Sequence, residues 1–296
     1  MDKIEQPFMT EGFKALLLQD TGIGTSELAA RTCYKSFNKS NDTTIKNLGV
    51  NLYTGLTQDE YISEYRGDLH DLPHSDLLDS LAWTHHHHSV MEHVVLTYAL
   101  TMSRGVLQEL ARQRISSPSV KSTRYTMKDI IDAYVASENN QTIGSREWFV
   151  KKVKTFKMFC ITGSLEDREI ESIYDKLYTY EGVKLVTIAD TCLSNEAKKE
   201  LEISLEEDDT TSDDLFQILQ ICKAKRNAGD SIKFIVTDTW LTEVVWTINL
   251  RSLKNFLELR NSGAAWKPMQ YLAQQIEQAT PTKYLSLILK SHKGKK

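Results

Sequence analysis

The densest chemistry in this sequence lies in residues 112–125, which read RQRISSPSVKSTRY. Four cations are interleaved there with serine, threonine and tyrosine hydroxyls, directly after an amphipathic run. Guanidinium groups bind phosphates through paired donors, and small hydroxyls add hydrogen bonds. The composition therefore suits a bound phosphate or a polarised heterocycle. A competing interpretation is that Arg112 and Arg114 only complement the negative end of a preceding helix, which contributes at most about 1 kcal/mol.

A second candidate is the histidine-rich run at residues 85–93, HHHHSVMEH. Its side chains His87, His88, Glu92 and His93 could supply nitrogen and oxygen ligands to a metal ion. The run lacks the helical His-Glu-x-x-His pattern, however, and a tract of four histidines is not itself a coordination geometry. We therefore predict no metal site.

A third candidate is the segment WTINLRSLKNFLELR, residues 246–260. On a helix its polar side chains would share one stripe: Asn249, Ser252, Asn255 and Arg260. Amides within an otherwise apolar helix cost stability unless they are satisfied, so the stripe requires hydrogen-bonding partners. The alternative is that the amides hydrogen-bond locally and that Arg260 pairs with an acid such as Glu258.

These three segments, in this order, resemble the signature of the flavin-dependent thymidylate synthases. That signature is usually written Arg-His-Arg, about seven residues, then Ser, often continuing Thr-Arg-Tyr; here Gln113 takes the place of the His. The histidine run resembles the family's His-x-Ser/Thr-x-x-Glu-His, and the last segment its Asn-x-Arg, three residues, Asn, four residues, Arg. The resemblance covers roughly residues 25–34, 75–125 and 233–276.

The resemblance implies specific roles for matching positions. It implies contacts with FAD for His87, Ser89, Arg112, Gln113, Arg114, Asn249, Arg251 and Asn255. It implies contacts with the nucleotide substrate for Glu109, Arg112, Val120, Lys121, Ser122, Thr123, Arg124, Lys233 and Arg260. Arg260 is implied to be catalytic, because attack from C5 of uracil requires negative charge to be stabilised on the ring. Glu92 and His93 are implied to be structural supports.

The implied reaction is the reductive methylation of dUMP to dTMP. The methylene comes from methylenetetrahydrofolate and the hydride from reduced FAD, which is itself reduced by NADPH. No protein nucleophile is needed, which agrees with the lack of a convincing Cys/His or Ser/His pair in the sequence. The resemblance also implies a homotetramer with sites at subunit interfaces. Its fold would be α/β (α+β), a mostly antiparallel central sheet flanked by helices, with long C-terminal helices.

Several departures from the family pattern crowd the implied pocket. Gln113 can hydrogen-bond but cannot ionise, and Val120 stands where an acidic residue is common. Glu109 lies where the family often has Gln or Glu, and Lys233 replaces a usual Arg, losing the bidentate fork. One alternative is therefore a divergent flavin-dependent pyrimidine deoxynucleotide hydroxymethylase.

A non-catalytic nucleotide-binding homologue is a further alternative. It would use a basic patch formed by Arg104, Arg112, Arg114, Lys121, Arg124 and Lys128. The formal net charge of −4 argues against bulk nucleic-acid binding. Four widely spaced cysteines indicate reduced thiols, and there is no signal or membrane-length apolar run, so we expect a soluble cytoplasmic protein without a membrane partner.

The elements that must position these residues follow from periodicity. We expect a strand at 13–18, a helix at 25–34 capped by Thr25 or Ser26, only short helices at 35–72, and a helix at 75–83 capped by Ser75. A strand at 94–102 should lead into a helix at 105–114, and Pro118 should leave the following segment as a loop.

The second half of the chain is patterned less evenly. Residues 170–177 predict a helix closed by Gly182, and the acidic run 206–214 predicts a solvated loop. A strand is expected at 234–236, with mostly helical structure from 240 to 275. We predict a single domain over residues 1–296 with an insertion within about 130–230, because the family's usual chain is shorter.

Overall fold

The protein is described by a computed structural model that covers residues 5–294 except 74, 124–127, 139–143, 180–232 and 234. Five sequence predictions fall outside this range: the helix end at Gly182, the acidic loop at 206–214, the thiols of Cys192 and Cys222, and Arg124. Among the described residues, no helix is long and apolar enough to cross a membrane.

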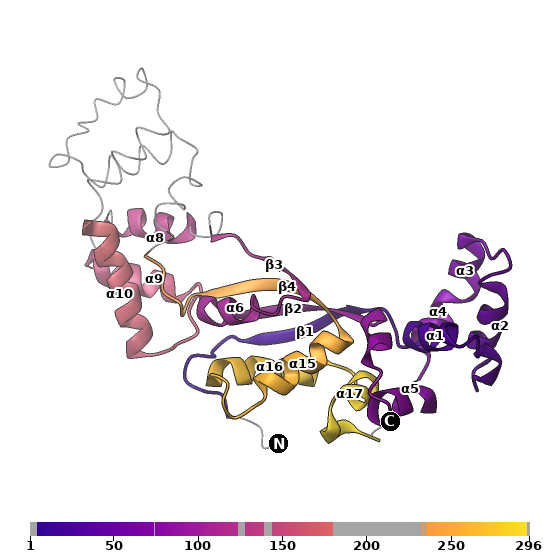
Figure 1. The fold of residues 1–296 in the computed structure, drawn as a ribbon. Helices are drawn as coiled ribbons and strands as arrows, with labels where there is room; N and C mark the ends of the chain where they lie inside the picture. Colours follow the sequence, from indigo (N-terminus) through magenta and orange to yellow (C-terminus); the bar gives the residue numbers. More distant parts are fainter. Residues whose placement is uncertain are drawn as a thin grey trace.

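A four-stranded antiparallel sheet forms the centre of the fold, in the order β1-β2-β4-β3 (Figure 1). Its strands are β1 (Lys14–Asp20), β2 (Val95–Ser103), β3 (Ser116–Val120) and β4 (Leu241–Asn249). Buried and more exposed residues alternate along β2 and β4, which is typical of a sheet with one face on the core. The predicted α/β fold and the strands at 13–18 and 94–102 are confirmed.

The two long C-terminal helices cover one face of this sheet (Figure 1). They are α15 (Leu250–Arg260) and α16 (Lys267–Ala279), and α17 (Thr282–Ile288) follows them. Trp246 of β4 is fully buried on this face, with its ring 6.1 Å from that of Tyr98 on β2 and 5.1 Å from that of Phe256 on α15. This aromatic stack fixes α15 against the strands that precede it.

Two sequence predictions for the C-terminal third are wrong. The helix expected from residue 240 begins only at Leu250, because 241–249 alternates with a period of two and pairs with β2 along its whole length. The strand expected at 234–236 is absent from its described residues, since Ile235 and Val236 lie in a turn and a bend. Both are buried, so their apolar character reflects packing rather than strand pairing.

The loop predicted around Pro118 is also wrong. Residues 116–120 form β3, in which Pro118 is paired with Trp246 of β4. Proline is tolerated in a strand at the edge of a sheet, because one side of such a strand needs no backbone partner. The preceding helix, α6 (Arg104–Leu110), ends four residues earlier than predicted, and this leaves the chain room to turn into β3.

The N-terminal region between β1 and β2 contains only short helices, as predicted. They are α1 (Gly24–Cys33), η1 (Phe37–Lys39), α2 (Thr43–Asn51), α3 (Gln58–Glu64), α4 (Arg66–Asp71), α5 (Asp76–Trp83) and η2 (His88–His93). The cap by Ser75 is confirmed, with Oγ accepting from Leu78 N. The cap expected at Thr25 or Ser26 is wrong, because Ser26 Oγ donates to the Val90 carbonyl at 2.9 Å and so ties α1 to the segment before β2.

In the described part of the region predicted to be an insertion lie three helices: α8 (Lys128–Glu138), α9 (Ser145–Lys154) and α10 (Ser164–Thr179). They pack on one another through the rings of Tyr134, Phe149 and Tyr174, whose centroids are 5.5–6.1 Å apart. In Figure 1 they lie at the end of the sheet away from α1–α5. The single domain and its insertion stay predictions.

Asp20, at the end of β1, joins the sheet to two helices. Its carboxylate accepts hydrogen bonds from the Tyr284 hydroxyl and from the Gly22 N–H, and it lies 2.9 Å from His70 Nε2. Burial by itself raises the pKa of Asp20, but the hydrogen bonds and the interaction with His70 outweigh it, so this pKa is lower than usual.

We therefore expect the stability of the protein to fall as the pH drops below about 4, the usual pKa of aspartate. A carboxyl group whose pKa is lowered by folding stabilises the folded state while it is ionised, and protonation removes that contribution. Urea unfolding midpoints measured from about pH 7 to about pH 3 should therefore fall less for Asp20→Asn than for the wild type. Equal falls would contradict the prediction.

Candidate functional site

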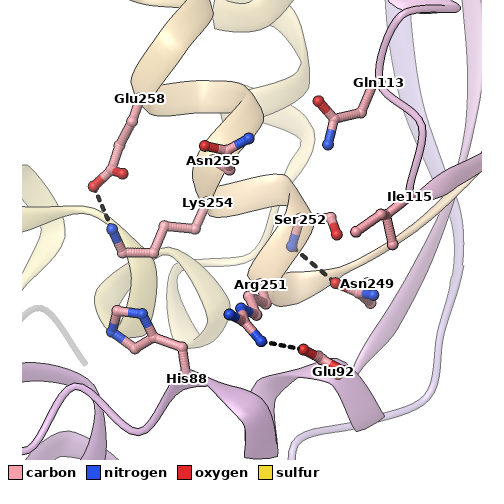
Figure 2. Close-up of a pocket in the computed structure, with 10 residues that line it drawn as sticks. All are labelled: His88, Glu92, Gln113, Ile115, Asn249, Arg251, Ser252, Lys254, Asn255 and Glu258. Atoms are coloured by element: carbon pink, nitrogen blue, oxygen red, sulfur yellow. Dashed lines mark hydrogen bonds and ion pairs between the residues drawn. The ribbon is translucent and has the colours of Figure 1, made fainter.

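A polar pocket of about 460 Å³ lies at the N-terminal end of α15 (Figure 2). Three separate segments line it: the 3₁₀ helix η2 (His88–His93), the turn after α6, and the junction of β4 with α15. The lining residues are His88, Glu92, Gln113, Ile115, Asn249, Arg251, Ser252, Lys254, Asn255 and Glu258. The pocket thus joins parts of all three segments in which the sequence concentrates its chemistry.

Helix α15 begins at the pocket because Asn249 ends β4 in an extended conformation and caps the helix. Its Oδ1 accepts a hydrogen bond from the Ser252 N–H at 2.8 Å. The apolar side of the helix, Leu250, Leu253 and Leu257, is fully buried, so the opposite side must face outward. Asn249, Ser252 and Asn255 of the predicted polar stripe therefore line the pocket, although Asn249 contributes as the cap and not as a helical residue, whereas Arg260 does not line it.

Two ion pairs set the charge of the pocket. Arg251 pairs with Glu92 of η2, and Lys254 pairs with Glu258 one turn further along α15 (Figure 2). The partial positive charge at the helix N-terminus adds to the two cations. His88 Nε2 lies 3.1 Å from the Ala82 carbonyl oxygen, which fixes the ring at the pocket wall. The charged side chains form one side of the pocket, and Gln113 and Ile115 form the other.

A second cluster of predicted residues lies at the other end of α15. Arg260 Nη1 is 3.1 Å from Glu109 Oε2, and Arg260 Nη2 donates to the Glu109 carbonyl at 3.4 Å. Glu109 Oε1 also pairs with Arg112 Nη1 at 3.2 Å. The Arg260 side chain is only 18% exposed. The alternative partner considered for Arg260, Glu258, is instead bonded to Lys254.

The remaining predicted site residues are spread around these two clusters. His87, Ser89 and Arg114 are exposed, and His88 rather than His87 is among the pocket residues. Lys121 pairs with Glu243 of β4 at 3.0 Å, beside the exposed Val120. Ser122 and Thr123 follow β3, and Lys233 accepts a hydrogen bond from Arg104 at its carbonyl oxygen.

Sequence reasoning did not predict binding roles for six lining residues: His88, Glu92, Ile115, Ser252, Lys254 and Glu258. A helical period was the available signal for two of them, because Lys254 follows Arg251 at a spacing of three and Glu258 follows Lys254 at a spacing of four on α15. The described part of the chain has no cluster of three or more His, Cys, Asp or Glu side chains that could hold a metal ion.

Comparison with known proteins agrees with the motifs. The family model described as thymidylate synthase complementing protein, Thy1, matches residues 17–282. The flavin-dependent thymidylate synthase of Wolinella succinogenes is 28% identical, over 94% of this chain and 98% of that protein. That of Helicobacter pylori is 26% identical, over 88% of this chain and 90% of that protein.

The fold is similar to that of solved flavin-dependent thymidylate synthases. The crystal structure of the Helicobacter pylori enzyme ThyX, complexed with FAD and dUMP, superposes with a TM-score of 0.53 at 22% identity, covering 93% of this chain and 98% of that one. A second structure of that enzyme gives a TM-score of 0.54 at 21% identity. The family model spans most of the chain, and the protein therefore belongs to the thymidylate synthase complementing protein family, Thy1, as its resemblance to flavin-dependent thymidylate synthases predicted.

Proposed function

We propose that this protein is a flavin-dependent thymidylate synthase that converts dUMP to dTMP with methylenetetrahydrofolate, FAD and NADPH. The observation that carries the proposal is the lining of the α15 pocket. It includes Gln113, Asn249, Arg251 and Asn255, four of the residues that the family motifs predict to contact FAD. These residues come from segments more than a hundred positions apart, so their meeting in one pocket does not follow from local sequence.

The chemistry of the pocket fits FAD. A diphosphate is stabilised by the N-terminus of a helix and by cations, and α15 offers both its N-terminus and Arg251. The amides of Gln113, Asn249 and Asn255 can both donate and accept hydrogen bonds, as the edge of a flavin ring requires. When bound, the flavin supplies the hydride chemistry; the protein supplies orientation and charge.

The cluster around Arg260 supports substrate binding. Glu109 holds the guanidinium from α6, so Arg260 is positioned before any ligand arrives. A fixed cation stabilises negative charge that develops on a uracil ring better than a mobile one, because no reorganisation is needed during the reaction. Arg112 shares Glu109 and is largely exposed, which supports a role in binding the more solvent-accessible part of the nucleotide, its phosphate.

We also propose the homotetramer with sites shared between subunits. The sheet face opposite the buried Trp246 carries a row of directly paired residues, Leu16, Ala99, Val245 and Ser119. Leu16 and Val245 are 61% and 44% exposed, respectively, and such apolar exposure on a sheet favours burial against another chain. His87, Ser89 and Lys121 would then complete the site of a neighbouring subunit.

Light scattering during gel filtration tests the proposed tetramer, and a monomer would contradict it.

Product analysis tests the proposed reaction. Purified protein is supplied with FAD, NADPH, methylenetetrahydrofolate and dUMP, and the nucleotides are resolved by mass. We expect dTMP. A hydroxymethylated nucleotide would instead establish the divergent hydroxymethylase. Protein that cannot be reconstituted with FAD would contradict a flavoenzyme and leave the nucleotide-binding homologue.

We expect Arg251→Ala to weaken FAD binding about ten-fold or more, because a hydrogen bond to a charged group contributes roughly 1.5–3 kcal/mol. Quenching of flavin fluorescence during titration measures the dissociation constant. Arg66→Ala, at an exposed arginine of α4, is the matched control and should bind FAD as the wild type does. An Arg251→Ala protein with unchanged affinity would argue against this pocket as the FAD site.

A further inference from the structure

Lys254 lies in an unusual position for a lysine. It lines the pocket on α15, and its side chain is only 17% exposed, whereas lysines are mostly exposed in folded proteins. The family motifs do not include it, because it occupies one of the unspecified positions between Arg251 and Asn255. A shielded cation in a polar pocket requires an anionic partner.

The partner that the structure shows is Glu258, whose side chain is 52% exposed. An ion pair with so exposed a carboxylate contributes little to stability, so exchanging that carboxylate for another anion costs little. Glu92 neutralises Arg251 in the same way. The two carboxylates therefore balance the two cations of the pocket, and an anionic ligand that enters must take over at least one cation from its carboxylate.

The positions of the side chains in Figure 2 favour Lys254 as the cation that leaves its carboxylate and binds the anionic ligand. Lys254 and Arg251 lie on the charged side with His88, and the side chains of Gln113 and Ile115 lie opposite. An ammonium group acts as a compact point charge, which suits a phosphate oxygen better than the edge of a heterocycle. The charged side therefore suits phosphate groups, and the opposite side suits the ring system.

We propose that Lys254 is a further phosphate-binding residue of this pocket, which binds a phosphate group of FAD, and that Glu258 holds its ammonium group until the ligand arrives. The proposal rests on the proposed function, because it takes FAD as the occupant. It assigns to Lys254 a contact that the family motifs do not specify. It assigns to Glu258 the role of a competing anion that lowers affinity for the cofactor.

The test compares FAD with riboflavin, which carries the same ring system without phosphate. Lys254→Met keeps a long side chain on α15 but removes its charge. We expect it to weaken FAD binding about ten-fold and to leave riboflavin binding within about two-fold of the wild type. The affinity of the wild type for FAD should also fall more steeply with added salt than that of Lys254→Met. Lys254→Arg, which retains a cation, should recover most of the affinity for FAD.

Glu258→Gln provides an independent test that leaves Lys254 in place. Removing the competing carboxylate should tighten FAD binding severalfold without changing riboflavin binding. This variant keeps the proposal testable if Lys254→Met does not fold, as judged from its thermal unfolding.

Four outcomes would overturn the proposal. Equal losses of FAD and riboflavin affinity in Lys254→Met would show that Lys254 supports the ring or the fold instead. Unchanged or weaker FAD binding in Glu258→Gln would show that Glu258 does not compete with the ligand. If the wild type and Lys254→Met bind FAD equally well, only the inference about Lys254 is overturned. If the wild type binds no FAD, the proposed function is overturned as well.

Discussion

Replacing Arg260 by alanine is expected to lower the rate of dTMP formation at saturating substrate by about 10²- to 10³-fold, the usual effect of removing one preorganised donor to developing negative charge. The Arg260 side chain is 18% exposed and its guanidinium is held by Glu109 in two contacts, so the cation is positioned before the substrate binds. Steady-state kinetics give kcat and KM, and binding of FAD measured by fluorescence should remain close to that of the wild type, because Arg260 is not among the residues lining the α15 pocket.

Two further variants test separately how the charge of Arg260 and the position of its guanidinium affect the rate. Arg260→Lys keeps the cation but loses the fork that contacts both the carboxylate and the carbonyl of Glu109, so we expect partial activity. Glu109→Gln keeps both arginines but weakens their positioning, and it should lower kcat less than Arg260→Ala. A kcat for Arg260→Ala within a few-fold of the wild type would be inconsistent with a catalytic role.

The largest expected effect on folding is at Trp246, where substitution by alanine should cost about 3–5 kcal/mol of unfolding free energy. Trp246 is fully buried between the rings of Tyr98 and Phe256, so the change leaves a cavity where the sheet meets α15. Urea unfolding followed by circular dichroism measures the difference. Because α15 carries the pocket residues, FAD affinity should fall together with stability.

Phenylalanine at position 246 is the matched control. Trp246 Nε1 is buried without a hydrogen-bond partner among the described residues, so Trp246→Phe loses volume but no hydrogen bond. We expect it to cost clearly less than the alanine variant. Equal losses for phenylalanine and alanine would mean that the indole nitrogen contributes an interaction that the structure does not show.

Local sequence was sufficient to predict several elements of the fold and the family of this protein. β-Branched and aromatic residues with partial alternation identified β2, and the Ser75 hydroxyl identified the start of α5. The order and spacing of the three motifs were sufficient to predict the family, which the match over residues 17–282 confirms. Each strand, cap and single motif depends on residues that are neighbours in the sequence, where backbone geometry and side-chain period are the main constraints.

Only the tertiary structure decided which residues meet. Residues 241–249 became a strand because β2 pairs with them, and Pro118 was admitted to β3 because that strand lies at the edge of the sheet. Arg260 bonds to Glu109, 151 positions away, rather than to the nearby Glu258. Such pairings depend on how the faces of distant elements pack, and a one-dimensional pattern specifies which face of each element is apolar but not which other element will cover it.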